Sequence, residues 1–356
     1  MAENVFILGA GASRKAGAPL MKEFLDSAED LLKKGKIGDA KGDFELVFRA
    51  FESLKMAAAK AQMDFENVES VFAAFEMAKL LGRLDDLGEE DLNRLPSAMR
   101  RVIFTTLEER IKLPVSHQHP RAPSPYEEFV ELVRKIGAES TVSIITFNYD
   151  LCLDLALLQK RIEIDYCLDP TDRSGGIKYI KLHGSLNWGR CSSCNKIVPW
   201  LLQDFFGNFH WNIYGDDTKE VSFHLASLFK EFKHCDKKGV VLEPIIVPPT
   251  WNKGQHHEEL REVWKAGAAE LSNAENIFII GYSLPETDQF FRNLFALGTI
   301  GRARIRQIKV FDPNAAVHEK FRTLFGPLAA ERYFPEVADF DNAIAIIQGA
   351  PRRIAR

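Results

Sequence analysis

Short runs of apolar, β-branched and aromatic residues recur along the chain and break into glycine or polar residues. The first run, Val5-Phe6-Ile7-Leu8, ends directly in Gly9-Ala10-Gly11-Ala12-Ser13. Such a run followed by glycine predicts a buried strand and a tight turn, with a helix from about Leu20. Similar runs predict further strands at residues 142–147, 177–182, 240–247, 277–280 and 305–311.

Helical periodicity separates these strands. Apolar residues at spacings of three and four predict helices at residues 126–136, 258–271, 289–297 and 315–325. The same spacing, without any strand pattern, fills residues 40–113, where the apolar positions are Phe44, Val47, Phe48, Phe51, Val68, Val71, Phe72, Phe75 and Leu80. Because parallel strands need crossover connections, this alternation predicts an α/β fold with a Rossmann-like, mostly parallel sheet and helices on both faces.

The predicted sheet is assembled from three separate segments, residues 1–39, 114–185 and 241–325. Between them we expect a helical insertion at residues 40–113 and a small cysteine-bearing insertion at residues 186–240. A C-terminal extension, residues 326–356, follows. Sheets of this kind bind ligands beyond the carboxyl ends of their strands, and the unusual residues of the sequence follow the predicted strands.

Composition narrows the class of protein. The chain has 356 residues, of which 46% are hydrophobic, with a formal net charge of −4 and a pI near 6.2. These values predict a globular chain and argue against intrinsic disorder and against direct nucleic-acid binding. No apolar run approaches the roughly 18–20 residues that cross a bilayer, and the N-terminus lacks the basic region of a secretory signal, so we expect a cytoplasmic protein without membrane contact.

The glycines at positions 9 and 11 are the first candidate for chemistry. They allow a tight turn and a close approach to a pyrophosphate, with the amides of the following helix as donors. The third glycine of the usual dinucleotide fingerprint is replaced by Arg14. Taken alone, Gly9, Gly11 and Ser13 also suit a strand-to-helix turn that binds nothing, and His183 alone suits a structural hydrogen bond.

Four segments in register are more informative. The pattern Gly-Ala-Gly-x-Ser-x3-Gly-x-Pro at residues 9–19 resembles the cofactor loop of the sirtuin family. Downstream, the sequences Thr-Phe-Asn-Tyr-Asp at 146–150, Leu-His-Gly-Ser at 182–185 and Gly-Tyr-Ser-Leu at 281–284 are similar to the sirtuin Thr-Gln-Asn-Ile-Asp, His-Gly and Gly-Thr-Ser-Leu segments. Asn314 corresponds more loosely to an Asn that the sirtuin family commonly places near the adenosine half of NAD.

The resemblance implies a sirtuin-like NAD-binding domain with NAD+ as its substrate. Asn148 would hold the nicotinamide ribose and His183 would act as general base beside it. Asp150 would either orient this site or only cap the following helix, and Glu286 or Asp288 would cap the helix after residue 288. The implied cofactor-binding residues are Gly9, Ala10, Gly11, Ser13, Pro19, Asp150, Gly281, Ser283 and Asn314.

The cysteines raise the question of a metal. Five is an odd number, so a disulfide framework is not expected, and Cys152 and Cys167 are interpreted as buried thiols. Cys191-x2-Cys194 lies where sirtuins carry the first half of a structural zinc ribbon, and Cys235 lies in the second half. Lys238 stands where a fourth cysteine would fall, and His234 is adjacent to Cys235, where two neighbours seldom reach one ion.

Two outcomes therefore stay open for this insertion. Either Cys191, Cys194 and Cys235 hold a structural zinc, or the ribbon has lost its metal and is held by an apolar cluster. The members of that cluster would be Trp188, Trp200, Phe205, Phe206, Phe209 and Trp211.

The resemblance leaves three functions open. Water would attack the ribose in an NAD+ hydrolase, an acyl-lysine carbonyl would attack it in a deacylase, and a sensor would bind NAD or an ADP-ribose derivative without cleaving it. Leu20-Met21-Lys22 in place of the sirtuin Asp-Phe-Arg, Tyr149 beside Asn148, and the helical insertion favour the hydrolase. They look like a divergent bacterial branch of anti-phage effectors, which implies a homo-oligomer and a separate regulatory or ATPase partner.

Overall fold

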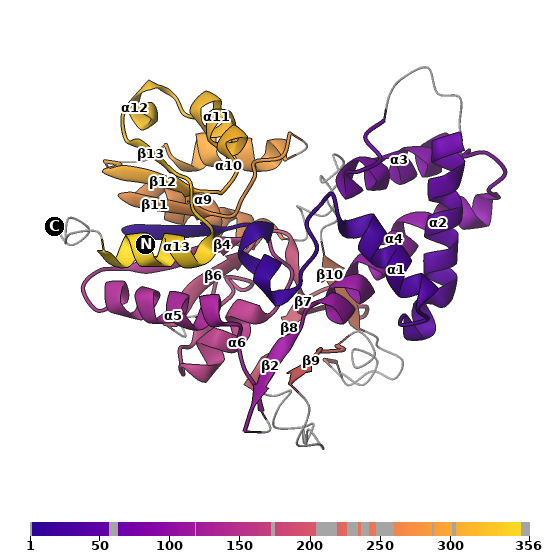
Figure 1. The fold of residues 1–356 in the computed structure, drawn as a ribbon, viewed down its shortest axis with the longest axis horizontal. Helices are drawn as coiled ribbons and strands as arrows, with labels where there is room; N and C mark the ends of the chain where they lie inside the picture. Colours follow the sequence, from indigo (N-terminus) through magenta and orange to yellow (C-terminus); the bar gives the residue numbers. More distant parts are fainter. Residues whose placement is uncertain are drawn as a thin grey trace.

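The computed structural model describes residues 2–56, 63–117, 119–171, 175–203, 219–225, 234–235, 242–246, 260–286, 288–300 and 304–349. A seven-stranded sheet forms its centre (Figure 1). The strand order is β13-β12-β11-β1-β4-β6-β5, and every neighbouring pair is parallel. The predicted mostly parallel α/β sheet is confirmed.

The strands of this sheet are β1 (Asn4–Leu8), β4 (Val142–Thr146), β5 (Ile164–Asp165), β6 (Ile177–Lys181), β11 (Asn276–Ile280), β12 (Gln307–Phe311) and β13 (Tyr333–Glu336). All five residues of β1 and of β11 are buried. Strands covered on both faces are expected to be continuously apolar, which is why these runs were visible in the sequence.

Helices cover both faces of the sheet. The sheet helices are α5 (Ser124–Gly137), α6 (Cys152–Gln159), α9 (Arg261–Asn273), α10 (Gln289–Gly298), α11 (Ala315–Leu324), α12 (Pro327–Ala330) and α13 (Phe340–Gly349). Phe6 of β1 meets Phe129 of α5 edge-on at 5.2 Å. Phe6 is paired with Ile144, and the next residue, Ile145, is paired with Ile180. Successive side chains of a strand point to opposite faces, so Ile180 lies on the face opposite Phe6, against α9.

A group of helices stands beside the sheet (Figure 1). It consists of α1 (Phe24–Lys33), α2 (Lys41–Met56), α3 (Val68–Leu81) and α4 (Glu89–Arg110), and α1 and α3 both pack on α4. Their buried residues include Phe44, Phe72 and Phe75 at the predicted helical spacing. The first predicted helix begins later than expected. A 3-10 helix, η1 (Ala10–Ala16), follows β1, and α1 starts at Phe24 rather than near Leu20.

Two small sheets complete the described residues. One has the order β10-β7-β8, from β7 (Gly184–Cys191), β8 (Ile197–Pro199) and β10 (Leu242–Ile246), all antiparallel. The other has the order β3-β2-β9, from β2 (Leu113–Ser116), β3 (His119–Pro120) and β9 (Glu220–Val221). The predicted strand at 240–247 thus exists as β10, but it pairs with β7 and not with the parallel sheet.

The segment after residue 326 is part of the sheet and its covering layer. β13 extends the sheet beside β12, and α13 packs on α5, where Phe340 lies 5.2 Å from Tyr126 between ring centroids. The division of the chain into domains stays a prediction. Among the described residues, no helix combines the length and the apolar character needed to cross a bilayer.

Candidate functional site

The four motif segments begin at the carboxyl ends of four neighbouring strands. Gly9 follows β1, Phe147 follows β4, Leu182 follows β6 and Gly281 follows β11. The strands are parallel and in register, with Leu8 opposite both Thr146 and Ile280, so their ends meet at one edge. The fold therefore brings the sequence motifs together.

Two of the loops touch backbone to backbone. Gly9 N–H donates to the Ile280 carbonyl at 3.0 Å, and Gly11 N–H donates to the Gly281 carbonyl at 2.9 Å. A Cβ on Gly9 would lie 2.5 Å from the Gly281 oxygen, and Gly281 itself has φ +62°, in the left-handed region. Glycine is required here for space at position 9 and for conformation at position 281.

These contacts change the expected role of the glycine loop. The Gly11 amide is bonded to Gly281, and the Ala12 amide donates to the Gly9 carbonyl at 3.0 Å. The helix that follows is the 3-10 helix η1, so the amides of an α-helix start are not offered at this point. The expected anion cradle is replaced by a packed junction of two loops.

A hydrogen-bonded set centred on Ser13 holds Asn148. The Asn148 side-chain amide donates to Ser13 Oγ at 2.8 Å and to the Gly9 carbonyl at 2.9 Å. Ser13 Oγ lies 2.5 Å from Asp150 Oδ2 and 2.7 Å from the Tyr126 hydroxyl. Ser13 has one hydroxyl hydrogen, which goes to the carboxylate, so Tyr126 donates to Ser13 as Asn148 does.

This set fixes the orientation of the Asn148 amide. Both hydrogens of its nitrogen are directed to protein acceptors, and Asn148 is 9% exposed. The side-chain oxygen Oδ1 is then the atom through which Asn148 can accept from a ligand. Burial and the charge of Asp150 raise the pKa of Tyr126 well above its ordinary value, which keeps Tyr126 a donor.

Asp150 contacts both Ser13 and the start of a helix. Its Oδ2 accepts from Ser13, and its Oδ1 accepts at 3.0 Å from the amide of Cys152, the first residue of α6, whose N-cap is Leu151. The role of Asp150 toward a ligand stays a prediction. Asp288 is the N-cap of α10 in place of Glu286, accepting from the Phe291 amide at 3.2 Å, and it also accepts from the Tyr282 hydroxyl at 2.6 Å.

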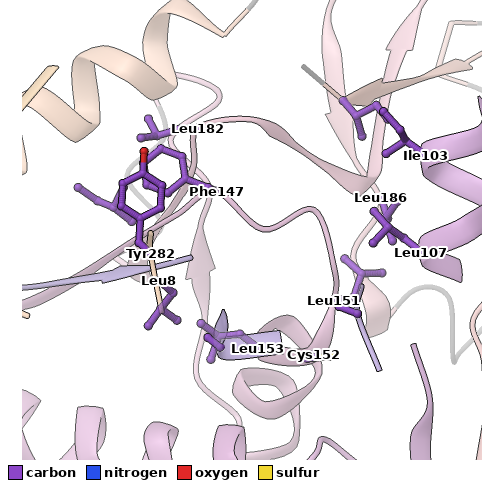
Figure 2. Packing of buried hydrophobic residues seen from close by; sticks show 14 of the residues in the cluster. Leu8, Ile103, Leu107, Phe147, Leu151, Cys152, Leu153, Leu182, Leu186 and Tyr282 are labelled. Carbon is purple, nitrogen blue, oxygen red and sulfur yellow. The ribbon is translucent and has the colours of Figure 1, made fainter. Parts of the chain in front are cut away.

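His183 lies among aromatic rings that the other motifs supply. Its ring centroid is 5.1 Å from that of Phe147 and 6.2 Å from that of Tyr149, and His183 is 5% exposed. Phe147 in turn stacks on Tyr282 at 4.3 Å, and Figure 2 shows these two rings face to face. His183 therefore lies at a group of aromatic residues that come from two other motifs, residues 146–150 and 281–284.

The remaining predicted cofactor residues lie around this edge. Ala10 and Pro19 are half-buried and Ser283 is exposed. Asn314 is exposed, and its side chain accepts from the Ala316 amide at 3.0 Å as the N-cap of α11. Their roles toward a ligand stay predictions.

A small pocket lies on the other side of the loop 148–151. It lies between α4 on one side and the start of α6 and of β7 on the other. Figure 2 shows Leu107, Leu151 and Leu186 facing one another there. Its lining residues are Leu107, Glu108, Ile111, Leu113, Leu151, Cys152, Leu186, Phe223 and Leu225. It is apolar apart from Glu108, so it does not resemble a nucleotide site.

Four candidate metal ligands gather at the end of β7. The ligand atoms of Cys191, Cys194, His234 and Cys235 all lie within 4.8 Å of one another. Cys191 Sγ is 3.7 Å from Cys235 Sγ, while His234 Nδ1 is 3.4 Å from Cys194 Sγ and 3.5 Å from Cys235 Sγ. Tetrahedral zinc, with bonds of about 2.3 Å to sulfur and about 2.0 Å to nitrogen, requires about 3.8 Å between sulfurs and about 3.5 Å between sulfur and nitrogen.

The cluster therefore fits a structural zinc with a Cys3His donor set. His234 Nδ1 lies where a fourth ligand would be, so the geometry lets the adjacent residues His234 and Cys235 reach one ion. Burial opposes ionisation of Cys191, but donors from Cys194, Ser193 and His234 outweigh it and lower the pKa of its thiol to about 6. Trp188 and Trp200 are buried nearby, whereas Lys238, Phe205, Phe206, Phe209 and Trp211 lie outside the described residues.

Sequence reasoning missed several residues that build this site. Tyr126, which donates to Ser13, comes from an amphipathic helix with no motif around it. Lys181, at the end of β6, is fully buried, although a lysine beside a motif gives no signal of burial. His234 is not among them, because the sequence already offers it as a candidate ligand next to Cys235.

No family model matches the chain, and no curated protein matches it in sequence. Among solved structures, the chain is similar to a Sir2 homologue in complex with NAD. The two sequences are 16% identical, the match covers 98% of this chain and 91% of that chain, and the TM-score is 0.40. A mutant Sir2 homologue in complex with ADP-ribose has 15% identity, covers 98% and 93%, and has a TM-score of 0.39. Sir2Tm bound to a propionylated peptide has 12% identity, covers 97% and 90%, and has a TM-score of 0.37.

Proposed function

We propose that the chain is an NAD+ hydrolase that releases nicotinamide and ADP-ribose. The observation that carries this proposal is the hydrogen-bonded set of Ser13, Asn148 and Asp150, with His183 on the adjoining strand end. Cleavage of the nicotinamide–ribose bond needs a ribose held in one orientation and one placed nucleophile. The set supplies a fixed polar contact, and His183 supplies a titratable group near it.

The chemistry follows from which atoms are occupied. Since both amide hydrogens of Asn148 are bonded within the protein, its Oδ1 would accept a hydrogen bond from a ribose hydroxyl. That contact orients the ribose as positive charge develops at its anomeric carbon, as in other glycoside cleavages. His183 would accept a proton from a ribose hydroxyl or from water, as imidazole side chains do in general base catalysis.

Residues around Tyr149 favour water over an acyl-lysine as the nucleophile. Burial raises the pKa of Tyr149, and the charges of Glu69 and Asp288 raise it further. An aromatic ring at position 149 and the helical group at residues 40–113 both depart from the sirtuin pattern, and these departures support water as the nucleophile in our proposal.

The test is a time course of NAD+ loss and nicotinamide release, with and without an acylated peptide. We expect peptide-independent loss, and at least a 100-fold lower rate for Asn148→Ala, the size of effect seen when one preorganised polar group is removed. Asn273→Ala, which removes an amide that bonds the Ala269 carbonyl in α9, is the matched control and should keep full activity.

Other outcomes contradict the proposal. Loss that requires the peptide identifies a deacylase, and NAD binding without turnover identifies a sensor. Undiminished nicotinamide release by Asn148→Ala would remove Asn148 from the mechanism and with it the basis of the assignment.

We also propose, from the motif resemblance, a cytoplasmic bacterial anti-phage effector that acts as a homo-oligomer or with a separate regulatory or ATPase partner. Cells expressing the chain should lose NAD+ after phage infection, and cells expressing Asn148→Ala should not. Equal NAD+ levels in the two strains during infection would contradict this role.

A further inference from the structure

Lys181 is a buried cation at the end of β6, two residues before His183. Its side chain is 0% exposed. Its Nζ donates to the backbone carbonyl of Asp150 at 2.7 Å and to Asp154 Oδ2 at 3.1 Å. One ammonium group therefore joins the strand that leads to His183 with the loop that carries Asn148.

The contact of Lys181 with the Asp150 carbonyl lies close to both proposed catalytic residues, Asn148 and His183. β4 and β6 are neighbours, with Thr146 opposite Lys181. Beyond this pair one more backbone bond, from the Leu182 amide to the Thr146 carbonyl at 2.9 Å, joins the strands, and Asn148 and His183 lie in the two loops that follow. The bond from Lys181 to the Asp150 carbonyl is a further tie to the loop 148–150, beside the bond from the Leu186 amide to the Tyr149 carbonyl at 3.0 Å.

The anchor of Lys181 extends to the strand on the other side of His183. Asp154 Oδ1 accepts from the Tyr166 hydroxyl, which accepts from Asn187 Nδ2 at 3.3 Å. Asn187 Oδ1 accepts from the Ser185 hydroxyl at 2.6 Å on β7. All of these groups are buried, so His183 lies between two points of one hydrogen-bonded network.

Stability alone is a poor explanation for this arrangement. Two charges that are taken out of water lose hydration, and a well-packed apolar pair often replaces them without loss of stability. Removing one partner leaves an uncompensated buried charge, so the pair must be kept or replaced together. A charged pair at this point is instead suited to holding a backbone carbonyl in one place.

We propose that Lys181 is a positioning residue that fixes the loop 148–150 relative to His183. It touches no ligand and acts through the Asp150 carbonyl. The inference rests on the proposed function only for its kinetic consequence, because the positional effect is measurable without any substrate.

The test compares two variants that each neutralise an ion pair between a lysine of β6 and a buried carboxylate. Lys181→Met/Asp154→Asn removes the pair at the site, and the amide oxygen keeps an acceptor for Tyr166. Lys178→Met/Glu270→Gln removes the pair three residues upstream, where Lys178 Nζ lies 2.7 Å from Glu270 Oε1. The second variant is the matched control, since it lies away from the strand ends.

Hydrogen exchange in the peptide covering residues 147–152 is the first measurement. The Asn148 amide donates to Thr146 Oγ1 and the Cys152 amide to Asp150 Oδ1, so both report on this loop. We expect exchange at least tenfold faster in Lys181→Met/Asp154→Asn and unchanged in the control. If the double variant fails to fold by circular dichroism, Asp154→Asn alone, which keeps Lys181 but weakens its anchor, should give an intermediate increase.

Steady-state nicotinamide release is the second measurement. We expect kcat to fall at least tenfold in Lys181→Met/Asp154→Asn with KM for NAD+ within threefold, and neither to change in the control. Unchanged exchange in the loop, or faster exchange with an unchanged kcat, overturns the inference. A wild-type chain that releases no nicotinamide refutes the proposed function instead, and hydrogen exchange then decides the role of Lys181 by itself.

Discussion

The junction between the Gly9 and Gly281 loops makes a graded steric prediction. Gly9→Ala would place a Cβ 2.5 Å from the Gly281 carbonyl oxygen, 2.5 Å from Tyr282 Cα and 2.7 Å from Tyr282 Cβ. Ordinary contacts between such atoms lie at about 3.5 Å. The two nearest obstacles are backbone atoms, which cannot turn away as a flexible side chain would.

The free-energy cost follows from what must move. Relieving an overlap of about 1 Å separates the two loops, and overpacking of this kind costs about 1–3 kcal/mol or more. The hydrogen bonds from Gly9 to Ile280 and from Gly11 to Gly281 cross the same junction, and each contributes about 1 kcal/mol. We therefore expect Gly9→Ala to lower the free energy of unfolding by about 3–5 kcal/mol and, at an unfolding entropy of about 2.1 cal/mol/K per residue, to lower Tm by about 4–7 °C.

Three further substitutions calibrate the measurement. Gly11→Ala meets backbone at 2.9 Å and should destabilise less than Gly9→Ala. Gly267→Ala in α9 meets its nearest atom at 3.5 Å, and Gly42→Ala in α2 meets nothing within 4 Å, so both should leave stability unchanged or raise it by up to about 1 kcal/mol. Thermal and denaturant unfolding measure all four. A Gly9→Ala protein as stable as the Gly42→Ala protein would refute the described junction.

Three other predictions concern the metal, pH and thiols. The purified chain should contain about one zinc per chain by elemental analysis. His234→Ala should lose that zinc on treatment with a chelator, because the three remaining ligands would not retain it. Full zinc content in the variant would contradict the assignment. Burial raises the pKa of Asp312 above 3.8, so folding favours the protonated carboxyl. The resulting stabilisation is complete below pH 3.8 and is lost as the pH rises through the raised pKa. Asp312→Asn should therefore gain stability over wild type between pH 4 and pH 7 in urea titrations, and a constant difference across that range would refute it. Burial and the charges of Asp150 and Asp154 raise the pKa of Cys152, so a thiol reagent should label Cys152 only on unfolding. Rapid labelling of Cys152 in the folded chain, located by peptide mass spectrometry, would contradict its placement.

Much of the parallel sheet could be predicted because its central strands are buried on both faces. β1 and β11 are continuous apolar runs, and their bounds agree with the predictions to within one residue. β7 could not be found this way. Its sequence, Gly-Ser-Leu-Asn-Trp-Gly-Arg-Cys, has no apolar periodicity, and it becomes a strand by pairing with β10, which lies about fifty residues later.

β13 was missed for a different reason. It is a four-residue edge strand that contains Pro335, and proline is unfavourable inside a sheet except at an edge. Its position depends on the exposed edge of β12, which is a tertiary feature. The strand predicted at 305–311 was also too long, because β12 starts at Gln307 and Arg306 instead pairs with Glu275 at 2.7 Å.

In the candidate site, too, some residues could be predicted from the sequence and others could not. Asn148, His183 and the loop glycines are recognisable because each lies in a short local motif. Their supports are not, since Tyr126 reaches Ser13 across 113 positions and Lys181 reaches Asp150 across 31. Such contacts depend on helix packing and strand order, so no local pattern records them.

The position of β1 in the sheet has a consequence for synthesis of the chain. β1 precedes its partner β11 by 272 positions, and the Gly9–Gly281 junction waits for the same segment. At about 5–20 residues per second, one edge of this apolar strand stays without its partner for roughly 15–55 s. During that interval an apolar strand edge is unpaired, and such edges are prone to aggregate.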